Sequence, residues 1–406
     1  MMIPAFIRNK FVGVQQPLGR WILRHILEFI VLSPLILVTI FWFKLRKREV
    51  ILVGVASSVI SSFLAPLEPE MRRRLKTKYR LSRTTVLNLS DDANLQIRKM
   101  YDQIVKIYGD ERKIRRRLIW WACKLGVKNS SPNQNLSDES WRADSPSFDF
   151  SDSENSFGDT FLESLGISEG NSFVCFATRS ESYYRKLIES GVVVKPRSVR
   201  NPHEAIYLDV AIKLLKKSLI PIRMGKDLDA EISSINYPGV IDYAMLARTD
   251  FLDTFLLKNC KFLFVGNTGI VWFRWLFNLP SLHCDVYDIR YTQFKNDVFI
   301  FQKVMLTSEN RLATVSEMLK MRSEYSDERH QSRLGVELVK NTADEIFAAC
   351  EEMNARIDGT WETTVEDEKL QQRYLDLVIK YSDQPTWRGG GRVGTQFLRD
   401  NQDLLK

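Results

Sequence analysis

The sequence is poor in the residues that build metal sites and disulfide frameworks. Its 406 residues include only four histidines and five cysteines, and none of them form a CxxC pair or stand at ligand spacing. We therefore predict no structural zinc. Because the cysteines are odd in number and widely spaced, the pattern predicts reduced, buried thiols. They are Cys123, Cys175, Cys260, Cys284 and Cys350.

The chain also lacks the interleaving of aromatic and basic residues that is typical of a nucleic-acid-binding sheet. Its formal net charge is +8 and its pI is near 9.1, and many of the basic residues crowd the first fifty positions. Basic clusters beside an apolar helix favour anionic lipid over nucleic acid. We therefore expect a membrane surface, and no nucleic acid, among the partners. The crowded residues are Arg8, Lys10, Arg20, Arg24, Lys44, Arg46, Lys47 and Arg48.

The apolar run from Phe29 to Phe43 predicts a helix that contains Pro34. Fifteen residues rise only about 22 Å, less than the roughly 30 Å of a bilayer core. Extension back to Trp21 adds length but brings in charged residues. Three interpretations stay open: a single span with snorkelled charges, a helix kinked at Pro34 that dips into one leaflet, or a buried soluble helix. Membrane contact is favoured, because no signal-peptide cleavage pattern follows.

Composition divides the rest of the chain into candidate domains. A hydrophobic content of 44% over this length is enough for two cores, and the length suggests two or three domains. Strands and helices alternate from Phe173 to about Lys303, which predicts a parallel, doubly wound sheet. We expect an N-terminal basic and apolar helix in 1–48, a first Rossmann-like domain in 49–128, a flexible acidic, Ser-rich insertion in 129–160, a second Rossmann-like domain in 161–335, and C-terminal helices in 336–406 that pack back across the domains.

The most informative stretch runs from Thr249 to Phe273 and reads as helix, buried strand, glycine turn and second helix. Gly266 and Gly269 let the backbone approach a ligand closely, and Asn267 or Thr268 can cap the following helix. The free N–H groups and the helix dipole at such a turn favour an anion. The turn is thus a candidate phosphate site, although most glycine-bearing turns of this kind bind nothing.

Upstream, a second apolar run ends in Arg223, which places this arginine at the carboxyl end of a strand. Open α/β sheets bind their ligands at that edge, and a guanidinium matches two diphosphate oxygens at once. The structural alternative is a salt bridge from Arg223 to Asp227 or Asp250. Val240 to Ala244 is a third short strand candidate, and it could deliver Asp242 to the same edge.

Seven stretches carry a resemblance to a known family. They are LGISEGNSFVCFATRSESYY (165–184), RN (200–201), RMG (223–225), DYA (242–244), TDFLDTFLLKNCKFLFVGNTG (249–269), NTADEI (341–346) and RVGTQFLRDN (392–401). From about its middle to its end, the chain resembles a bacterial family of glycosyltransferases linked to surface polysaccharide synthesis. The resemblance implies an α/β GT-B fold, two facing Rossmann-like domains with parallel sheets, of which the C-terminal one holds the nucleotide-sugar donor.

The resemblance also implies a role for individual residues. Arg223 takes the diphosphate, as the arginine of fucosyltransferase-like enzymes does, and the glycine turn lies beside it. Because the leaving phosphates need positive charge, Lys226 and Arg179 join the donor site. The donor-binding candidates are thus Arg179, Arg223, Gly225, Lys226, Gly266, Asn267, Thr268 and Gly269. A nucleotide sugar, a glycan or lipid-linked acceptor and the membrane surface are the expected partners. Since nucleotide sugars are cytoplasmic, we expect the chain at the cytoplasmic face of the membrane.

The chain departs from the family pattern where the chemistry is expected. Relatives tend to carry His-Ala-Arg-Asp where this chain has Ala177 to Ser180, and Gly-His-Leu where it has the histidine-free run Val55 to Pro66. An inverting transfer needs a base within reach of the acceptor hydroxyl. The catalytic candidates are Glu181, Asp242 and Asp250, each of which has an alternative role as helix cap or ion-pair partner.

Metal-independent transfer, with no cofactor, is the expected chemistry. No Asp-x-Asp pair follows a strand in the donor half, and Asp227 to Asp229 has the spacing but lies in a polar segment. Because the histidine and the acid of the family pattern are missing, a second interpretation stays open. It is a noncatalytic relative that binds a nucleotide sugar or acts as a scaffold.

Overall fold

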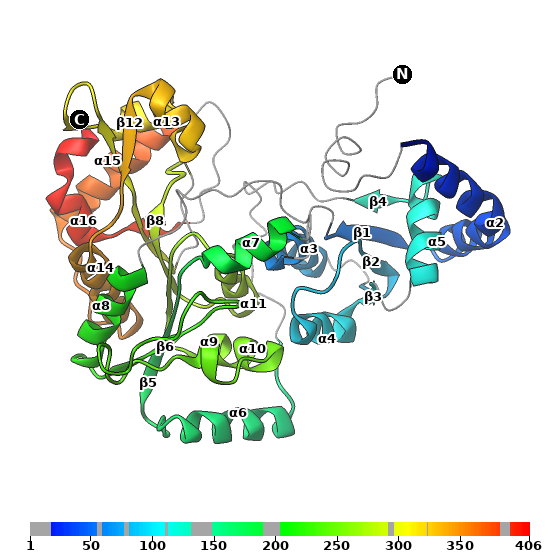
Figure 1. Cartoon of the computed structure of the whole chain (residues 1–406), viewed down its shortest axis with the longest axis horizontal. Coiled ribbons are helices and arrows are strands. Elements are labelled where there is room, and N and C mark those ends of the chain that lie inside the picture. The colour runs from blue at the N-terminus through cyan, green and yellow to red at the C-terminus, as the bar shows by residue number, and fades with distance from the viewer. Residues whose placement is uncertain are drawn as a thin grey trace. The chain divides into compact units, whose positions relative to one another are not determined.

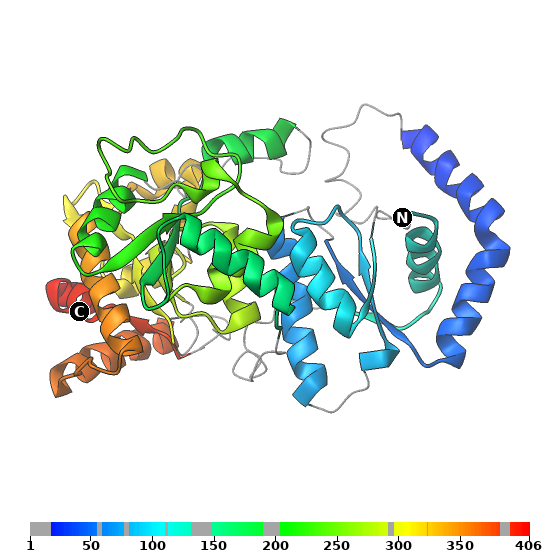
Figure 2. The ribbon, with the colours of Figure 1, turned by 90° about the horizontal axis from the view of Figure 1, so that it is seen from below.

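The computed structural model describes residues 18–54, 59–76, 81–109, 113–130, 148–189, 204–290, 296–322, 324–381 and 390–406. The chain forms two compact units: Met1–Gln134 with Tyr183–Pro196, and Asn135–Ser182 with Arg197–Lys406. Each unit contains a parallel sheet with helices beside it, as Figures 1 and 2 show. The predicted α/β class with two Rossmann-like domains is confirmed. The facing arrangement of a GT-B fold stays a prediction.

The sheet of the first unit has four parallel strands in the order β3-β2-β1-β4. They are β1 (Glu49–Val53), β2 (Thr84–Asn88), β3 (Lys106–Tyr108) and β4 (Asn129–Ser130). The helices of this unit are α2 (Leu18–Leu45), α3 (Ile60–Lys76), α4 (Leu95–Ile104) and α5 (Lys113–Lys124). The two longer strands form because their apolar runs pair in register, with Ile51 opposite Val86 and neither side chain exposed.

Helix α2 is longer than the apolar run that predicts it, because it begins at Leu18 rather than Phe29. Pro34 lies inside it and lacks the N–H that would bond to the carbonyl of Ile30. Ser33 Oγ donates to that carbonyl instead, at 2.8 Å. The local hydroxyl thus replaces the missing backbone bond, and the helix continues through the proline.

The second unit is built on six parallel strands in the order β13-β9-β8-β7-β5-β6. They are β5 (Ser172–Ala177), β6 (Leu219–Arg223), β7 (Leu263–Val265), β8 (Ser281–Val286), β9 (Val298–Phe301) and β13 (Arg392–Val393). The helices that precede or follow these strands are α6 (Asp152–Ser164), α7 (Glu181–Glu189), α8 (Glu204–Leu215), α9 (Tyr243–Leu246), α10 (Asp250–Asn259) and α11 (Arg274–Phe277). The predicted alternation of strand and helix is confirmed.

The part of the chain after β9 adds a small antiparallel sheet and a set of helices. The sheet has the order β11-β10-β12, with β10 (Lys303–Leu306), β11 (Arg311–Leu312) and β12 (Val336–Val339). The helices are α12 (Val315–Lys320), α13 (Glu328–Leu334), α14 (Ala343–Ile357), α15 (Val365–Tyr381) and α16 (Thr395–Asp400). The predicted C-terminal helices are confirmed, whereas their passage back to the first domain stays a prediction.

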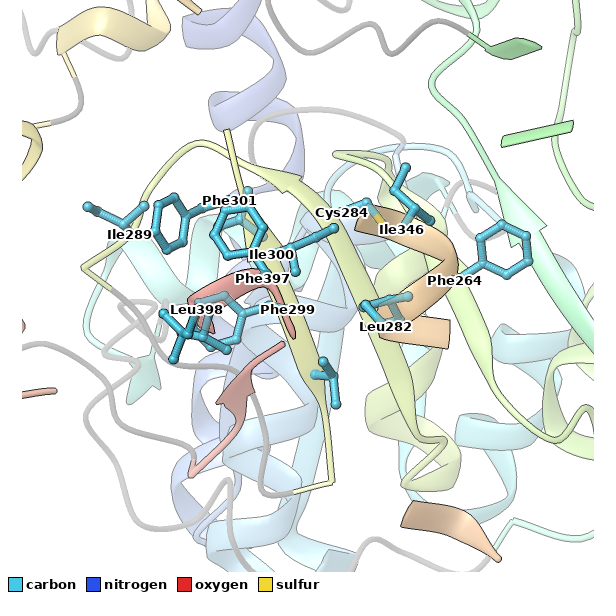
Figure 3. Packing of buried hydrophobic residues seen from close by; sticks show 14 of the residues in the cluster. Phe264, Leu282, Cys284, Ile289, Phe299, Ile300, Phe301, Ile346, Phe397 and Leu398 are labelled. Atoms are coloured by element: carbon cyan, nitrogen blue, oxygen red, sulfur yellow. The ribbon is translucent and has the colours of Figure 1, made fainter. Parts of the chain in front are cut away.

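The core of the second unit lies between its sheet and the C-terminal helices. The rings of Phe301 on β9 and Phe397 on α16 are 4.8 Å apart, and Phe299 lies 6.0 Å from Tyr374 on α15. Figure 3 shows Phe397 close to these strand residues and Ile346 of α14 close to β8. The tail of the chain is therefore part of this core, because it supplies side chains that the sheet buries.

The predicted flexible segment 129–160 differs from the structure after residue 148. Helix α6 begins at Asp152, and Ser151 and Glu154 exchange hydrogen bonds in a capping box at its start. Gly158 lets α6 approach α10, because an added Cβ would meet the Phe255 ring at 2.3 Å. The polar composition of the segment did not predict this contact, because one glycine and a few aromatic rings are enough for a polar helix to pack against α10. The middle of the segment lies outside the described residues.

The five cysteines are free thiols, and all but Cys123 are buried. This confirms the prediction of unpaired, mostly buried cysteines. Burial raises the pKa of the Cys123 thiol to about 12, and it also raises the pKa of the Cys175, Cys284 and Cys350 thiols well above the usual value. Such thiols stay protonated and unreactive at neutral pH.

A buried polar cluster beneath the short helix α11 joins Arg274, His283 and Asp297. Arg274 Nη1 lies 2.5 Å from Asp297 Oδ2 and also contacts the His283 ring. Burial, together with the charge of Arg274, lowers the pKa of His283 to about 4. The histidine is therefore neutral in the folded chain at pH 5, whereas in the unfolded chain it is protonated.

We expect His283 to make the second unit less stable in acid. Its pKa is lowered on folding, so its contribution to stability is complete above pH 6.5 and is lost as the pH falls toward 4. Between pH 7 and pH 5 the loss is about 2 kcal/mol. Asp253, whose pKa burial raises to about 6, acts in the opposite direction over the same window. Urea unfolding of wild type and His283→Gln at pH 7 and pH 5 measures how much the histidine contributes to the pH dependence of the free energy of unfolding. An equal pH dependence in both proteins would contradict this role.

Candidate functional site

The carboxyl ends of the parallel strands form one edge of the second sheet. Along the chain β5 comes first, β6 pairs with one side of it, and β7, β8 and β9 follow on the other side. The direction of winding therefore reverses between β5 and β7. Open α/β sheets bind ligands in the crevice outside the strand ends at such a switch point. The segments that follow β5 and β7 are thus the expected binding segments.

These two segments leave the sheet side by side. Ala177 and Val265, the last residues of β5 and β7, are register partners. The Gly266 N–H then donates to the Ala177 carbonyl at 3.3 Å. Residues 178–180 continue from β5 and residues 267–269 continue from β7. The structure therefore brings the backbone that carries Arg179 next to the predicted glycine turn.

The glycine turn is held by hydrogen bonds of its own residues. Asn267 Nδ2 donates to the Asp285 carbonyl at 2.6 Å, and the Thr268 N–H donates to the Gly266 carbonyl at 2.8 Å. Thr268 stands at the N-cap position of the next turn, but its side chain makes no capping bond. Asn267 therefore fixes the shape of the turn, and the expected capping by either residue is wrong.

One face of this turn is open. An added Cβ at Gly269 would meet no atom within 4 Å. Within the described part of the chain, the N–H groups of Gly269 and Ile270 have no acceptor. Adjacent N–H groups without acceptors form a concavity that suits an anion. The turn thus offers donors and space together.

The predicted helix after the turn is short, and this corrects the sequence-based expectation. Gly269–Phe273 is a 3-10 helix, and the α-helix that follows it, Arg274–Phe277, has only four residues. The apolar run continued the helical pattern, but Asn278 adopts the left-handed conformation and ends it. A helix this short has a weak dipole, so an anion at the turn would depend on the N–H groups and on nearby cations.

Arg179 and Lys226 are cations in the segments that follow β5 and β6. Arg179 follows β5 and is only 8% exposed. Lys226 follows β6, is exposed, and forms no ion pair within the described residues. Ser180 Oγ donates to the Asp227 carbonyl at 2.6 Å, which joins the segments after β5 and β6. Both cations therefore belong to loops that the structure ties together.

Arg223 lies at the end of β6, as predicted, but its guanidinium is engaged by the protein. It is 2% exposed, and Nη2 lies 2.6 Å from Glu204 while Nη1 lies 3.1 Å from Asp242. Nη1 also donates to the Ala230 carbonyl at 2.9 Å. The sequence-based alternative was a salt bridge from Arg223 to Asp227 or Asp250, and these predicted partners are wrong. A role of Arg223 in diphosphate binding stays a prediction, because it would require Glu204 to give way.

The glycine after Arg223 has a packing role. An added Cβ at Gly225 would meet Leu228 Cδ2 at 2.7 Å. Glycine at this position therefore lets the loop after β6 fold closely over its own leucine. Its predicted contact with the donor is untested.

Two of the three catalytic candidates have partners within the protein. Asp242 accepts from Arg223 and from the Ile232 N–H at 2.8 Å, so its oxygens are occupied. The predicted strand around it is a single bridge between Ile222 and Ile241, followed by helix α9. Asp250 lies in the first turn of α10, 3.3 Å from Arg248. Glu181 opens α7, and its side chain lies outside the described atoms.

Sequence reasoning missed Asp253, a buried carboxyl on α10. Burial raises its pKa to about 6, although Arg248 Nη2 at 2.5 Å and the Tyr243 hydroxyl at 3.0 Å favour the ionised form. It also missed Glu204, which bridges Arg223 and the Thr178 hydroxyl. The only signal for either residue was an acid in the first turn of a predicted helix, and such acids usually serve the helix.

No group of three or more potential metal ligands occurs among the residues that the structure describes. In the Asp-x-Asp segment, the Asp227 carbonyl accepts from Ser180 and the Asp229 carboxylate accepts from the Ser182 N–H at 3.2 Å. These bonds give the segment a structural role. Metal-independent chemistry stays a prediction.

Two of the stretches that carry the family resemblance stabilise the fold. Asn341 exchanges hydrogen bonds of 2.7 and 2.8 Å with Asp285, and Thr342 caps α14 in a capping box with Glu345. In the last stretch, buried Glu352 accepts from the Thr395 N–H at 2.6 Å. The RN pair at 200–201 lies outside the described residues.

Comparison with known proteins finds likeness only among solved structures. No protein-family profile matches the sequence, and no curated protein matches it. The E. coli ADP-heptose lipopolysaccharide heptosyltransferase II aligns with a TM-score of 0.40 at 10% identity, over 58% of this chain and 84% of that chain. A glycosyl transferase of family 9 from Veillonella parvula DSM 2008 aligns with a TM-score of 0.41 at 10% identity, over 58% and 79%.

A third structure is the dodecameric iron-containing heptosyltransferase TibC, solved in complex with ADP-D-beta-D-heptose. It aligns with a TM-score of 0.30 at 11% identity, over 59% of this chain and 59% of that chain. At these scores and identities, the likeness adds nothing to the geometry described above. The function of the chain is therefore argued from its own residues.

Proposed function

We propose that this chain is a glycosyltransferase. It binds a nucleoside-diphosphate sugar at the carboxyl edge of the second sheet and transfers the sugar to a glycan or lipid-linked acceptor, without a metal ion. We further propose that the reaction belongs to surface polysaccharide synthesis, which the family resemblance supports, and that it takes place at the cytoplasmic face of the membrane.

One observation carries the proposal: the glycine turn that follows β7 at the switch point of the sheet. It has two N–H groups without acceptors, open space above Gly269, and the Arg179 segment beside it. Diphosphate is the chemical group that such donors and cations recognise best. Other doubly wound folds bind nucleotides along this edge of the sheet.

The same groups would assist the reaction. As the acceptor oxygen bonds to the anomeric carbon, the bond from that carbon to the phosphate oxygen breaks, and negative charge grows on the diphosphate. Arg179, Lys226 and the turn N–H groups would stabilise that charge. The acceptor proton goes to a base, for which Glu181, Asp242 and Asp250 stay the candidates.

A panel of nucleoside diphosphates and their sugar conjugates tests the proposal. Calorimetry with the full chain should show binding of at least one nucleoside diphosphate, and the matching sugar donor should release that diphosphate when a glycan or lipid-linked acceptor is present. Absence of binding for adenosine, guanosine, uridine and thymidine conjugates would overturn the proposal.

The noncatalytic alternative rests on the same site. Asp242 is fully engaged with Arg223 and a backbone N–H, and Asp250 is paired with Arg248. A nucleotide-sugar-binding scaffold needs the diphosphate site but no base. Tight binding of a donor with neither hydrolysis nor transfer would favour this function over the enzyme.

A further inference from the structure

Helix α2 is fastened to the first unit near both ends of its apolar stretch. At one end, Glu28 pairs with Arg117 of α5, and Phe29 lies 4.9 Å from the Trp121 ring. At the other end, Phe43 is buried in the cluster that contains Val50 of β1. Figures 1 and 2 both show α2 and α5 side by side. About 22 Å of helix lies between these two attachments.

The opposite face of α2 is apolar and is not covered by the residues that the structure describes. The stretch His25–Leu45 is long and apolar enough to cross a membrane, and only 11% of its most apolar part is buried. The exposed residues recur at helical spacing, and each is at least half exposed. They are Leu27, Val31, Leu35, Val38, Phe41 and Leu45. An exposed apolar face of this size indicates an interaction surface.

The two attachments decide how a bilayer would cover this face. A helix that spans the bilayer would carry α5 into the hydrocarbon, together with the exposed Lys113 and Arg115 of that helix. Charges in the hydrocarbon core are costly. A helix that lies in the plane of the membrane buries only its apolar face and leaves the attachments intact. The structure therefore favours the interfacial arrangement among those that the sequence left open.

A cationic hollow of about 350 Å³ lies at the C-terminal end of α2. Its charged lining residues are Lys44, Lys47, Arg48, Arg83, Lys128 and Glu49. The cations come from the end of α2 and from the residues just before β1, β2 and β4. The hollow is therefore at the amino edge of the first sheet, which is the edge opposite to that used by ligands of doubly wound folds.

The positive charge of the hollow is largely uncompensated. Glu49 is the only carboxylate among the described residues that line it, and it pairs with Lys128 and also with Arg74 at 3.0 Å. Burial alone would raise the pKa of Glu49, but its pKa is lowered because Lys128 and Arg74 hold the ionised form. Within the described residues, Lys44, Lys47 and Arg83 form no ion pair. Three cations therefore stand without a counter-charge beside the apolar face.

Lys47 is held in a conformation that a lysine rarely adopts. The Arg48 N–H donates to the Phe43 carbonyl and the Lys47 N–H to the Lys44 carbonyl, which is the turn that usually ends in glycine. Lys47 occupies the left-handed position of that turn with φ 48°. A non-glycine residue there costs about 1 kcal/mol. Cations near a helix end stabilise the helix, but this effect accounts for neither the strained backbone nor Arg83.

We propose that α2 lies flat in one leaflet of a membrane and that the hollow holds the phosphate of an anionic phospholipid headgroup. The apolar face enters the acyl region, and the uncompensated cations lie at headgroup depth beside it. The proposal deepens the membrane location within the proposed function, but it needs neither a sugar donor nor catalysis.

Vesicle sedimentation of the full chain tests the hollow. We expect binding to phosphatidylcholine vesicles that contain 30% phosphatidylglycerol, and much weaker binding to pure phosphatidylcholine. Lys47→Gly with Arg83→Gln should lower the affinity about 25-fold, since each cation near a charged surface contributes about fivefold, or about 1 kcal/mol. Lys47→Gly relaxes the turn, so misfolding is not the expected result. Lys216→Gln with Arg373→Gln, which removes two exposed cations from the second unit, should leave the affinity unchanged.

Competition with inorganic phosphate distinguishes a lipid headgroup from free phosphate as the ligand of the hollow. Inorganic phosphate at millimolar concentration should not release the chain from the vesicles, because it lacks acyl chains. Release by free phosphate, or equal weakening by the paired variants of the first and second units, would overturn the proposal.

The apolar face is tested by charge and by depth. Val31→Glu with Val38→Glu should weaken vesicle binding about 100-fold. The control variant Ile235→Glu with Val365→Glu, at exposed sites of the second unit, should not weaken it.

Nitroxide labels at Val31→Cys and Val38→Cys, in a Cys123→Ser background, should lie at similar depth in the membrane. A depth difference of about 10 Å would indicate a spanning helix and contradict the flat arrangement. A dimer that the glutamates dissociate, without vesicle binding, would show that a second copy covers the face instead.

Discussion

Replacement of Gly269 by aspartate is expected to weaken binding of nucleoside diphosphate at least 100-fold. The new carboxylate would stand over the N–H groups of the turn, where it repels the diphosphate and takes its donors, and like charges so placed cost several kcal/mol. The fold should tolerate the change, because an added Cβ at Gly269 meets nothing within 4 Å and an acid suits the start of a helical turn. Calorimetric titration with the nucleoside diphosphate that wild type binds measures the effect.

Gly269→Asn is the matched control, since asparagine has the same size and no charge. We expect its affinity to stay within about fivefold of wild type. If the aspartate and asparagine variants lose affinity equally, bulk rather than charge is responsible. If neither variant loses affinity, the diphosphate does not bind at this turn, and the central observation of the proposed function is removed.

Replacement of Arg223 by methionine is expected to destabilise the second unit by about 3 kcal/mol. Arg223 is the shared partner of Glu204 and Asp242, and the Asp242 side chain is only 13% exposed. Removal of one member of a buried ion pair costs more than removal of both, because it leaves a charge without compensation. Urea unfolding of the full chain, followed by a probe in the second unit, measures the loss.

Two further variants separate this structural role from donor binding. Arg223→Met combined with Asp242→Asn should recover part of the lost stability, since the uncompensated charge is then absent. Arg223→Lys keeps the charge but loses the fork of donors. If Arg223 contacts the diphosphate, the lysine variant should bind the donor about 10- to 100-fold more weakly, the range for a charged hydrogen bond of 1.5–3 kcal/mol. Unchanged stability of Arg223→Met would contradict the ion-pair role.

Local features of the fold followed from short stretches of sequence. Apolar periodicity and capping residues indicate several elements directly. These elements are the strand before the glycine turn, the strand that ends at Arg223, and the helices α14 and α15. Thr342 and Glu345 are an example, because a capping box needs only residues three positions apart. Such features are predictable since the groups that stabilise them are neighbours along the chain.

Partners that are distant along the chain were not predictable in the same way. The sequence offered Asp227 and Asp250 as counter-charges for Arg223, whereas the folded chain uses Glu204 and Asp242. The docking of α6 depends on Gly158 meeting Phe255, nearly a hundred positions later. Each pairing is set by which helix covers which strand, and no local pattern records that choice.

By itself, the sequence determined where the strands, the capped helices and the apolar helix lie, and that a glycine turn follows a buried strand. The tertiary structure decided which side chains are free to act. It engaged Arg223 and Asp242 with each other, left the N–H groups of the turn open, and held α2 by both ends beside a cationic hollow. The reason is physical: burial and charge pairing depend on distances between elements, and these distances exist only once the chain has packed.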